Sequence, residues 1–237
     1  MIGDIWSWLS DPAHWSGSDG IVHRSVEHVI YTSVAVAVAL VVAVPIGAII
    51  GHTGRGGGLI AGLANVLRAL PSLGLLVLLA LWSLDALPVS IALESAAVIV
   101  LVVLAIPPIL TATYAGVAAV DPAARDAAAG MGMTGGQVLR SVELPIALPL
   151  VLSGLRSAYL QTVATATIAA FISLGGLGRY VLDGLAQHDY PKMAAGALLV
   201  ALLAILGDRL LALLGWAMTS PGLTGRRVAS SVATTQV

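Results

Sequence analysis

The sequence has no cysteine, a single phenylalanine and few charged residues. The absence of cysteine excludes disulfide bonds, thiolate metal sites and a cysteine-linked lipid anchor. Asp, Glu, Lys and Arg make up only 10% of the 237 residues, whereas soluble domains carry about 25%. So few charges cannot cover the surface of a soluble protein of this size, and the mean hydropathy of +0.98 agrees. Together, these absences predict an integral membrane protein.

Other absences exclude further classes of function. The net charge of −1 provides no basic surface, so we expect no nucleic-acid partner. The sequence lacks a Gly-x-x-x-x-Gly-Lys-Ser/Thr phosphate loop, a nucleophile–base pair and metal-ligand spacing, so we expect neither an enzyme nor a metal site. Residues 1–20 lack the features of a cleavable signal, so we expect the first span to direct insertion. The histidines are isolated and are expected in solvated loops: His14, His23, His28, His52 and His188.

Five apolar stretches are long enough to cross a bilayer, which takes about 20 residues for roughly 30 Å of hydrocarbon. They are rich in Ala, Val and Gly, which allow helix backbones to approach closely. Several prolines lie within or beside them and can kink or break a helix. We therefore predict an all-α membrane protein with about five transmembrane helices. The expected spans are residues 26–50, 59–82, 91–117, 146–174 and 193–216.

The basic residues set the expected orientation, because cytoplasmic loops carry an excess of Lys and Arg. With the N-terminus outside, the inner side holds Arg55, Arg125, Arg140, Arg226 and Arg227, with Arg68, Arg156 and Arg209 in or near the span ends. The outer side then holds Arg24, Arg179 and Lys192. We therefore predict an N-out, C-in topology. Residues 1–20 are expected as an outer interfacial segment, residues 21–217 as the transmembrane domain, and residues 218–237 as a disordered cytoplasmic tail.

The connection between the third and fourth expected spans, residues 121–145, carries the most informative pattern. Asp121 and Pro122 form a good helix start, because Asp can cap the helix and Pro suits its first turn. Small residues at 123–129 extend this helix, and Gly132 is expected to end the turn in a left-handed conformation. A second helical piece at 136–142 leads to the fourth span. Such a helix can make close contact with another protein on the predicted cytoplasmic side.

This connection resembles the EAA loop of the permeases of bacterial ABC importers. That loop reads Glu-Ala-Ala, three residues, Gly, nine residues, Ile-x-Leu-Pro. Here every interval is kept, with Asp in place of Glu and Val in place of Ile. The resemblance implies a methionine-importer-like type I permease fold whose loop couples to a separate ATPase. The residues implied for that coupling are Asp126, Ala127, Ala128, Gly130, Gly132, Met133, Thr134, Leu144 and Pro145. Asp126 could contact the ATPase or stabilise its own helix.

Within this family the chain is most similar to the permeases for osmoprotectants: glycine betaine, choline, carnitine and proline betaine. Four stretches carry this finer resemblance: residues 65–73, 113–117, 130–134 and 173–178. Thr111 and Ala112 stand where many such permeases have Arg-Asn. The methionine-type permeases share the five-span plan and the Gly-Gly-Leu-Gly turn, so an amino acid such as methionine is the alternative substrate. From other classes, an ion-coupled secondary transporter and a structural membrane subunit are the alternatives.

The resemblance also implies partners and location. Two permease subunits, identical or homologous, would form the pathway in the lipid bilayer of the bacterial cytoplasmic membrane. ATP and Mg would be held by the partner ATPases, and this chain would bind no cofactor. An external solute-binding protein, as a separate polypeptide, would deliver the substrate.

Polar side chains within the expected spans are candidates for the translocation pathway. Gln161, Thr162 and Thr165 could line it, or could hydrogen-bond between helices or to their own helix. Tyr114 and Tyr159 are further candidates, although the aromatic residues are too scattered to predict a cage for a cation.

Two charged residues also bear on the spans. Glu94 stands out as the one acid that could lie within a span, where an interfacial position near the helix N-terminus is favoured. Arg156 is expected to extend to the interface or to pair with a neighbouring acid.

Overall fold

The structure is a computed structural model that describes residues 2–172 and 174–219, and every regular element in these ranges is helical. The all-α prediction is therefore confirmed. The α-helices are α1 Ile2–Ser10, α2 Ile21–Thr53, α3 Gly57–Ala69, α4 Ser72–Ala86, α5 Val89–Ala118, α6 Pro122–Gly130, α7 Gly135–Val138, α8 Leu144–Ala169, α9 Gly178–Gln187 and α10 Tyr190–Met218. The shorter elements are the 3-10 helices η1 Pro12–His14 and η3 Ala170–Ile172, and the π-helix η2 Leu139–Glu143.

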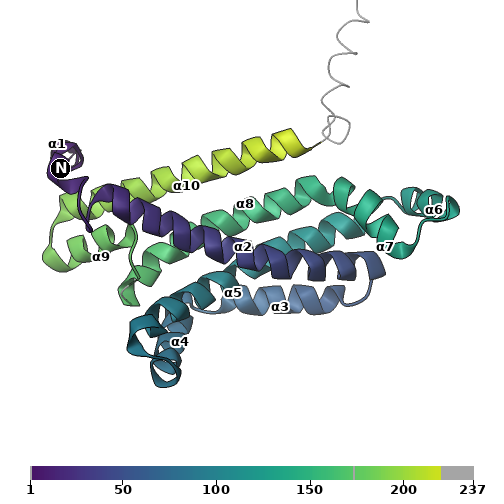
Figure 1. Cartoon of the computed structure of the whole chain (residues 1–237), viewed down its shortest axis with the longest axis horizontal. Helices are drawn as coiled ribbons and strands as arrows, with labels where there is room; N and C mark the ends of the chain where they lie inside the picture. The colour runs from purple at the N-terminus through teal and green to yellow at the C-terminus, as the bar shows by residue number, and fades with distance from the viewer. Residues whose placement is uncertain (1, 173, 220–237) are drawn as a thin grey trace, which may run out of the picture.

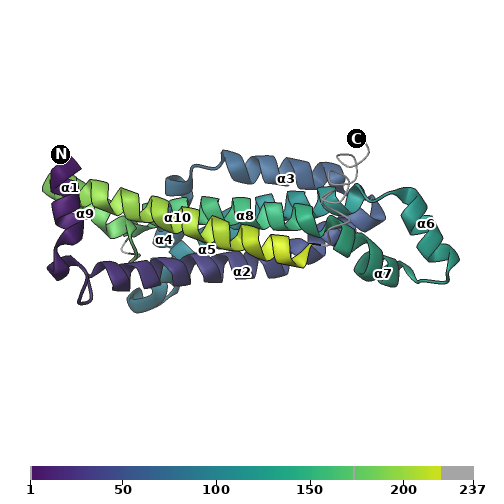
Figure 2. The same cartoon turned by 90° about the horizontal axis from the view of Figure 1, so that it is seen from above.

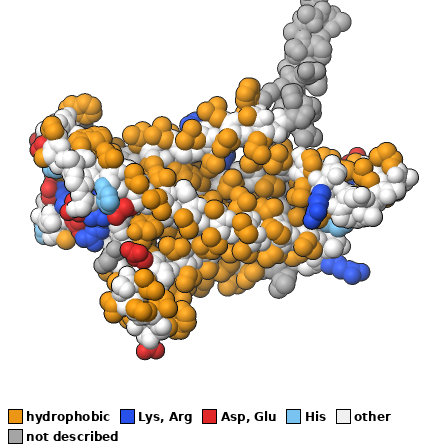
Figure 3. Space-filling model, viewed as in Figure 1, with side chains coloured by type: hydrophobic (Ala, Val, Ile, Leu, Met, Phe, Trp, Pro, Cys, Tyr) orange, Lys and Arg blue, Asp and Glu red, His pale blue; other side chains and the backbone are white. Residues whose placement is uncertain are grey.

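Four of these helices are long and apolar enough to cross a membrane: α2, α5, α10 and the continuous run from Gly135 to Ile172 that contains α8. The long helices lie along the long axis of the molecule (Figures 1 and 2). Helices α6 and α7 lie at one end, and α1 and α9 lie at the other. Hydrophobic side chains cover the middle of the face in Figure 3, and most charged side chains gather toward the two ends. This pattern suits a bundle whose middle faces lipid.

The second expected span, residues 59–82, is broken in two. Helices α3 and α4 meet at an angle of 85°, so together they count as one bent span at most. Leu70 and Pro71 at the break have extended backbone angles. Proline pushes the preceding residue out of the α region and has no N–H for the helix ladder. The count of about five spans is thus confirmed, whereas the prediction of one continuous helix over residues 59–82 is wrong.

Helix α5 occupies the centre of the bundle, where α2 and α8 pack along it and α3 and α4 flank it. The face of α2 toward α5 carries a small residue at every fourth position, which is one stripe along a helix. These residues are Ala35, Ala39, Ala43, Gly47 and Gly51, and all of them are buried. A Cβ added at Gly47 would lie 2.9 Å from the carbonyl oxygen of Leu110. The two backbones are therefore in direct contact, which only glycine permits at this position.

The two ends of the chain correspond to the expected interfacial segment and the expected cytoplasmic tail. Residues 2–14 form α1 and η1, and Trp8 of α1 stacks on His14 and meets Tyr180 edge-on. The placement of residues 1–20 at a membrane surface stays a prediction. Helix α10 ends at Met218. The expected disordered tail lies, from residue 220 onward, outside the described residues.

The contact between α2 and α5 makes a specific prediction for Gly47→Ala. The added methyl group would overlap the α5 backbone, and overpacking of this kind costs about 1–3 kcal/mol. We expect a clear fall in the apparent melting temperature of the purified protein in detergent. Gly62→Ala in α3 is the matched control, because nothing lies within 4 Å of a Cβ at that position. Equal melting temperatures for the two variants would contradict the proposed contact.

Candidate functional site

The loop after α5 begins with a well-capped helix. The carboxylate of Asp121 accepts a hydrogen bond of 2.9 Å from the backbone N–H of Ala123, and Pro122 occupies the first turn of α6. The helix ends at Gly130, and Gly132 has a φ of +86°. Both the helix start and the left-handed glycine predicted from the sequence are confirmed. This glycine reverses the chain so that α7 runs back toward the bundle.

The second helical piece, predicted over residues 136–142, continues into the next span instead of ending before it. Thr134 precedes α7, and its backbone N–H donates to the side-chain oxygen of Gln137 at 2.7 Å. From Gly135 the chain stays helical through the π-helical turn η2 and into α8, so no break separates the loop from the span. Pro145 cannot donate to the preceding turn, and the wide π turn lies directly before it. Movement of α7 would therefore be passed directly to α8.

Most of the residues implied for ATPase coupling lie on an exposed tip. Helix α6 extends beyond the ends of the long helices (Figures 1 and 2). The exposed members of the set are Asp126, Ala127, Gly130, Gly132, Thr134 and Pro145. Ala128 is buried, and Met133 and Leu144 are half-buried. Apart from Asp126, the exposed residues of α6 and its turn that belong to this set have small side chains.

The root of this loop contains a buried charged cluster that the sequence did not reveal. Glu143, the last residue of η2, is 0% exposed. Its carboxylate oxygens lie 2.7 Å from Nδ1 of His52 and 2.8 Å from Nε of Arg125. The expectation that His52 lies in a solvated loop is wrong, because α2 continues to Thr53, beyond the expected end at residue 50. The sequence indicated only that Arg125 is a basic residue of the inner side.

The polar candidates for the pathway find hydrogen-bond partners within the chain. The hydroxyl of Thr162 donates to the carbonyl of Ala158 at 2.7 Å, and that of Thr165 donates to the carbonyl of Gln161 at 2.9 Å. The amide of Gln161 donates across to Leu104 of α5 at 3.1 Å. Thr162 and Thr165 are 2% and 9% exposed. These contacts match the helix-bonding alternative stated above, and a role in the pathway stays a prediction.

The two aromatic candidates point to different parts of the bundle. The hydroxyl of Tyr159 donates to the carbonyl of Leu203 in α10 at 3.1 Å. Tyr114 packs in the core between α2, α5 and α8 and lies against Gly57 at the start of α3, where an added Cβ would overlap its hydroxyl. The five candidates therefore do not surround one cavity.

An ion pair connects two of the long helices. Arg156 of α8 makes two contacts with Asp208 of α10, from Nε to Oδ1 and from Nη2 to Oδ2, each 2.8 Å long. The predicted pairing of Arg156 with an acid is confirmed. The expectation that Glu94 is the one acid that could lie within a span is wrong, because Asp208 lies in α10. Glu94 is exposed near the start of α5, in agreement with the favoured position near a helix N-terminus. Asp208 was missed because it lies in an otherwise apolar run beside Arg209.

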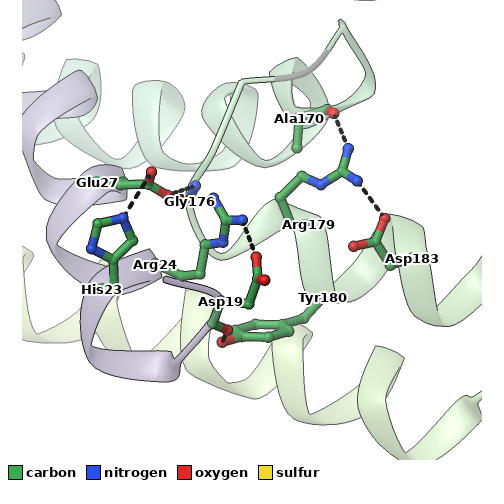
Figure 4. Close-up of polar contacts among 9 residues, drawn as sticks. All are labelled: Asp19, His23, Arg24, Glu27, Ala170, Gly176, Arg179, Tyr180 and Asp183. Atoms are coloured by element: carbon green, nitrogen blue, oxygen red, sulfur yellow. Dashed lines mark hydrogen bonds and ion pairs between the residues drawn. The ribbon is translucent and has the colours of Figure 1, made fainter. Parts of the chain in front are cut away.

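A further polar cluster lies at the opposite end of the bundle, where the turn after α8 meets the start of α2 (Figure 4). Glu27 accepts a hydrogen bond from the backbone N–H of Gly176 at 2.8 Å and pairs with Arg24 at the same distance. Arg24 also pairs with Asp19. Gly176 has a φ of +84°, which side chains rarely adopt. The predicted turn at residues 175–178 is confirmed and is tied to α2.

Two buried rings support this turn. Tyr180 of α9 donates its hydroxyl to the backbone carbonyl of Asp19, and burial raises the pKa of Tyr180 to about 12, so the phenol stays protonated. His28 is 1% exposed, and its Nε2 lies 3.2 Å from the carbonyl oxygen of Val163. The expectation of a solvated loop position for His28 is wrong, because His28 lies on a buried face of α2 inside the bundle. His23 and His188 are exposed.

The family described as "Binding-protein-dependent transport system inner membrane component" matches residues 43–219. The chain belongs to this family. It is 33% identical to the glycine betaine/carnitine/choline transport system permease protein OpuCB of Bacillus subtilis over 211 residues, which cover 89% of this chain and 94% of the relative. It is 34% identical to the osmoprotectant import permease protein OsmW of Salmonella typhimurium over 198 residues, which cover 83% and 91%.

Solved structures show the same fold. An inward-facing structure of the MetNI methionine ABC transporter superposes with a TM-score of 0.74 at 21% identity, and covers 89% of this chain and 100% of that chain. A chain of an amino acid ABC transporter with histidines gives a TM-score of 0.66 at 21% identity, and covers 83% and 93%. The predicted methionine-importer-like fold is confirmed. The chain is thus the permease subunit of an ABC importer and a multi-pass membrane protein, and not an ion-coupled secondary transporter.

In this permease the ion pair between α8 and α10 is open to a direct test. Asp208→Asn leaves the charge of Arg156 without its anion beside a lipid-facing helix. We expect the purified variant to lose several degrees of apparent melting temperature in detergent and α10 to become more susceptible to protease. Arg209→Gln is the matched control, because it removes a charge from an exposed position on the same helix. If Asp208→Asn melts at the same temperature as the control, the ion pair does not stabilise the contact between α8 and α10.

Proposed function

We propose that this permease imports a compatible solute with a quaternary ammonium group, of the glycine betaine, choline or carnitine type. An external binding protein delivers the solute, and a separate ATPase that docks on the loop of residues 121–145 supplies the energy. The observation that carries the docking is the projecting tip at α6, with its small side chains and left-handed Gly132. The relatives named above, from Bacillus subtilis and Salmonella typhimurium, support the substrate class.

The geometry supports a route from the ATPase to the transport pathway. Closure of two ATPases on ATP would displace α6, and the helix that runs unbroken from Gly135 to Ile172 would carry this displacement along the bundle. At its far end lies the turn at residues 175–178, which Glu27 ties to α2. A shift of α8 would therefore change the packing at both ends of the bundle. The pathway would then open alternately to the two sides of the membrane. Two permease subunits, identical or homologous, form this pathway in the proposal, and ATP and Mg are held by the ATPases.

Selectivity for the solute resides mainly in the binding protein in this proposal. Quaternary ammonium groups are bound by several aromatic faces at once. Two ring contacts, those of Trp8 with His14 and with Tyr180, lie at the α1–α9 end, away from the middle of the spans. The tyrosines within the spans point to separate neighbours, as described above for Tyr114 and Tyr159. The permease therefore supplies a permissive pathway and the binding protein supplies the recognition.

Competition between solutes tests the proposed substrate class. Proteoliposomes would contain the permease with its ATPase and binding protein, and would be loaded with ATP. We expect uptake of labelled glycine betaine that requires ATP and that excess choline or carnitine reduces, because all three carry the same cationic group. Excess methionine should leave uptake unchanged. Inhibition by methionine, without inhibition by choline or carnitine, would contradict the assignment and favour an amino acid as substrate.

A further inference from the structure

Glu143 is the most deeply buried acid among the described residues, with a side chain that is 0% exposed. Burying an isolated carboxylate costs several kcal/mol, so a carboxylate in such a place requires partners. It has two, which come from distant parts of the chain. His52 lies 91 residues before it, and Arg125 lies in the helix of the exposed tip. The contact distances of 2.7 and 2.8 Å place all three groups in one cluster, here named the Glu143 node.

The Glu143 node joins the exposed tip to three long helices. His52 lies in the last turn of α2, and Glu143 leads directly into α8. Arg125 of α6 uses its second guanidinium nitrogen to bond the backbone carbonyl of Val117, near the end of α5. One arginine side chain thus contacts the end of α5 and the start of α8, and through the carboxylate it reaches α2.

The π-helical turn determines where the carboxylate points. The N–H of Leu144 donates to the carbonyl of Leu139, five residues back, so η2 holds one residue more than an α-turn would. Each residue of an α-helix turns the side chain by about 100°. In a regular α-helix, residue 143 would therefore face a different direction from the one it takes here. The wide turn is the feature that brings Glu143 to His52.

Close packing on both sides of His52 limits its freedom. Gly51, the preceding residue, lies against α5, where an added Cβ would be 2.8 Å from the Cβ of Val117. On the other side, an added Cβ at Gly135 would lie 3.3 Å from Nε2 of His52. The half-buried imidazole therefore lies between Gly135 at the start of α7 and the carboxylate of Glu143. A displacement of the tip must carry this end of α2 with it or break the node.

We propose that Glu143, with Arg125 and His52, is the positioning node that converts displacement of α6 into a joint movement of α2 and α8. This inference rests on the proposed function, in which an ATPase docks on α6. The exposed residues of the tip make the contact with the ATPase, and the node transmits its movement to the spans. Loss of the node therefore separates ATP hydrolysis from transport and leaves the docking surface in place.

The first test is Glu143→Gln in the complete complex of permease, ATPase and binding protein. The amide keeps the size of the side chain and removes the negative charge between Arg125 and His52. We expect the ATPase to co-purify as with the wild type and ATP hydrolysis to continue. Uptake of solute per ATP hydrolysed should fall about tenfold, within the range of typical coupling energies. Glu94→Gln, at an exposed carboxylate of α5, is the control and should keep the wild-type ratio.

A second variant separates transmission from stability. Arg125→Met together with Glu143→Met replaces the buried charges by apolar side chains, a change that is often neutral or stabilising. The node predicts a stable complex with a low ratio of uptake to hydrolysis, because the polar link from α6 to α2 is gone. A purely structural role predicts a normal ratio once stability is restored. This variant decides the question if Glu143→Gln does not accumulate.

The outcomes distinguish the node from the proposed function. A ratio within twofold of the wild type, in either variant, would overturn the node while leaving the function intact. Uptake by the wild-type permease without any ATPase would instead overturn the proposed function.

Discussion

Direct contact between the backbones of neighbouring helices sets the geometry of this permease. Lipid provides no hydrophobic force that would draw apolar helices together, so packing at short range must do so. Gly47 and Gly51 of α2 meet α5, and Gly154 of α8 meets α5 at Ala112, where a Cβ would overlap. Helix α5 is therefore contacted on two sides by glycine residues, which allow its neighbours to approach closely. The ends of α2 and α8, on which the candidate site depends, are positioned by these contacts.

Charged side chains connect the helices of this apolar bundle at three positions along its length. Glu27 ties the start of α2 to the turn after α8, and Arg156 ties α8 to Asp208 of α10. At the other end, Glu143 ties the exposed tip to α2. Each connection joins segments far apart in sequence. Several of the few charged residues thus fix the positions of the long helices relative to one another. A displacement at one end of the bundle is therefore transmitted to the other end.

The sequence predicted what depends on local pattern. Apolar length located the spans, Asp121 and Pro122 located the start of α6, and the motif spacing located Gly132. The presence of proline did not predict where a helix breaks. Pro45 lies within the unbroken α2, whereas Pro71 lies at a sharp break. The difference depends on how neighbouring helices satisfy the freed backbone groups, which local sequence does not record.

The charged contacts were beyond prediction for a different reason. Nothing near His52 indicates a partner 91 residues away, and a small shift in the end of α2 decides whether His52 lies in the helix or in the following loop. The hydroxyl groups of Thr162 and Thr165 are equally suited to a pathway or to their own helix. Only the packed structure shows that both bond back to α8.

The proposed function depends on docking of a separate ATPase at the tip formed by α6. The most direct measurement is site-specific photo-crosslinking in membranes, with a photoreactive amino acid at Met131 on the tip or at Trp6 in α1. These side chains are 73% and 72% exposed and lie at opposite ends of the molecule. We expect an adduct with the ATPase from position 131 and none from position 6. An adduct from position 6, or none from position 131, would contradict it.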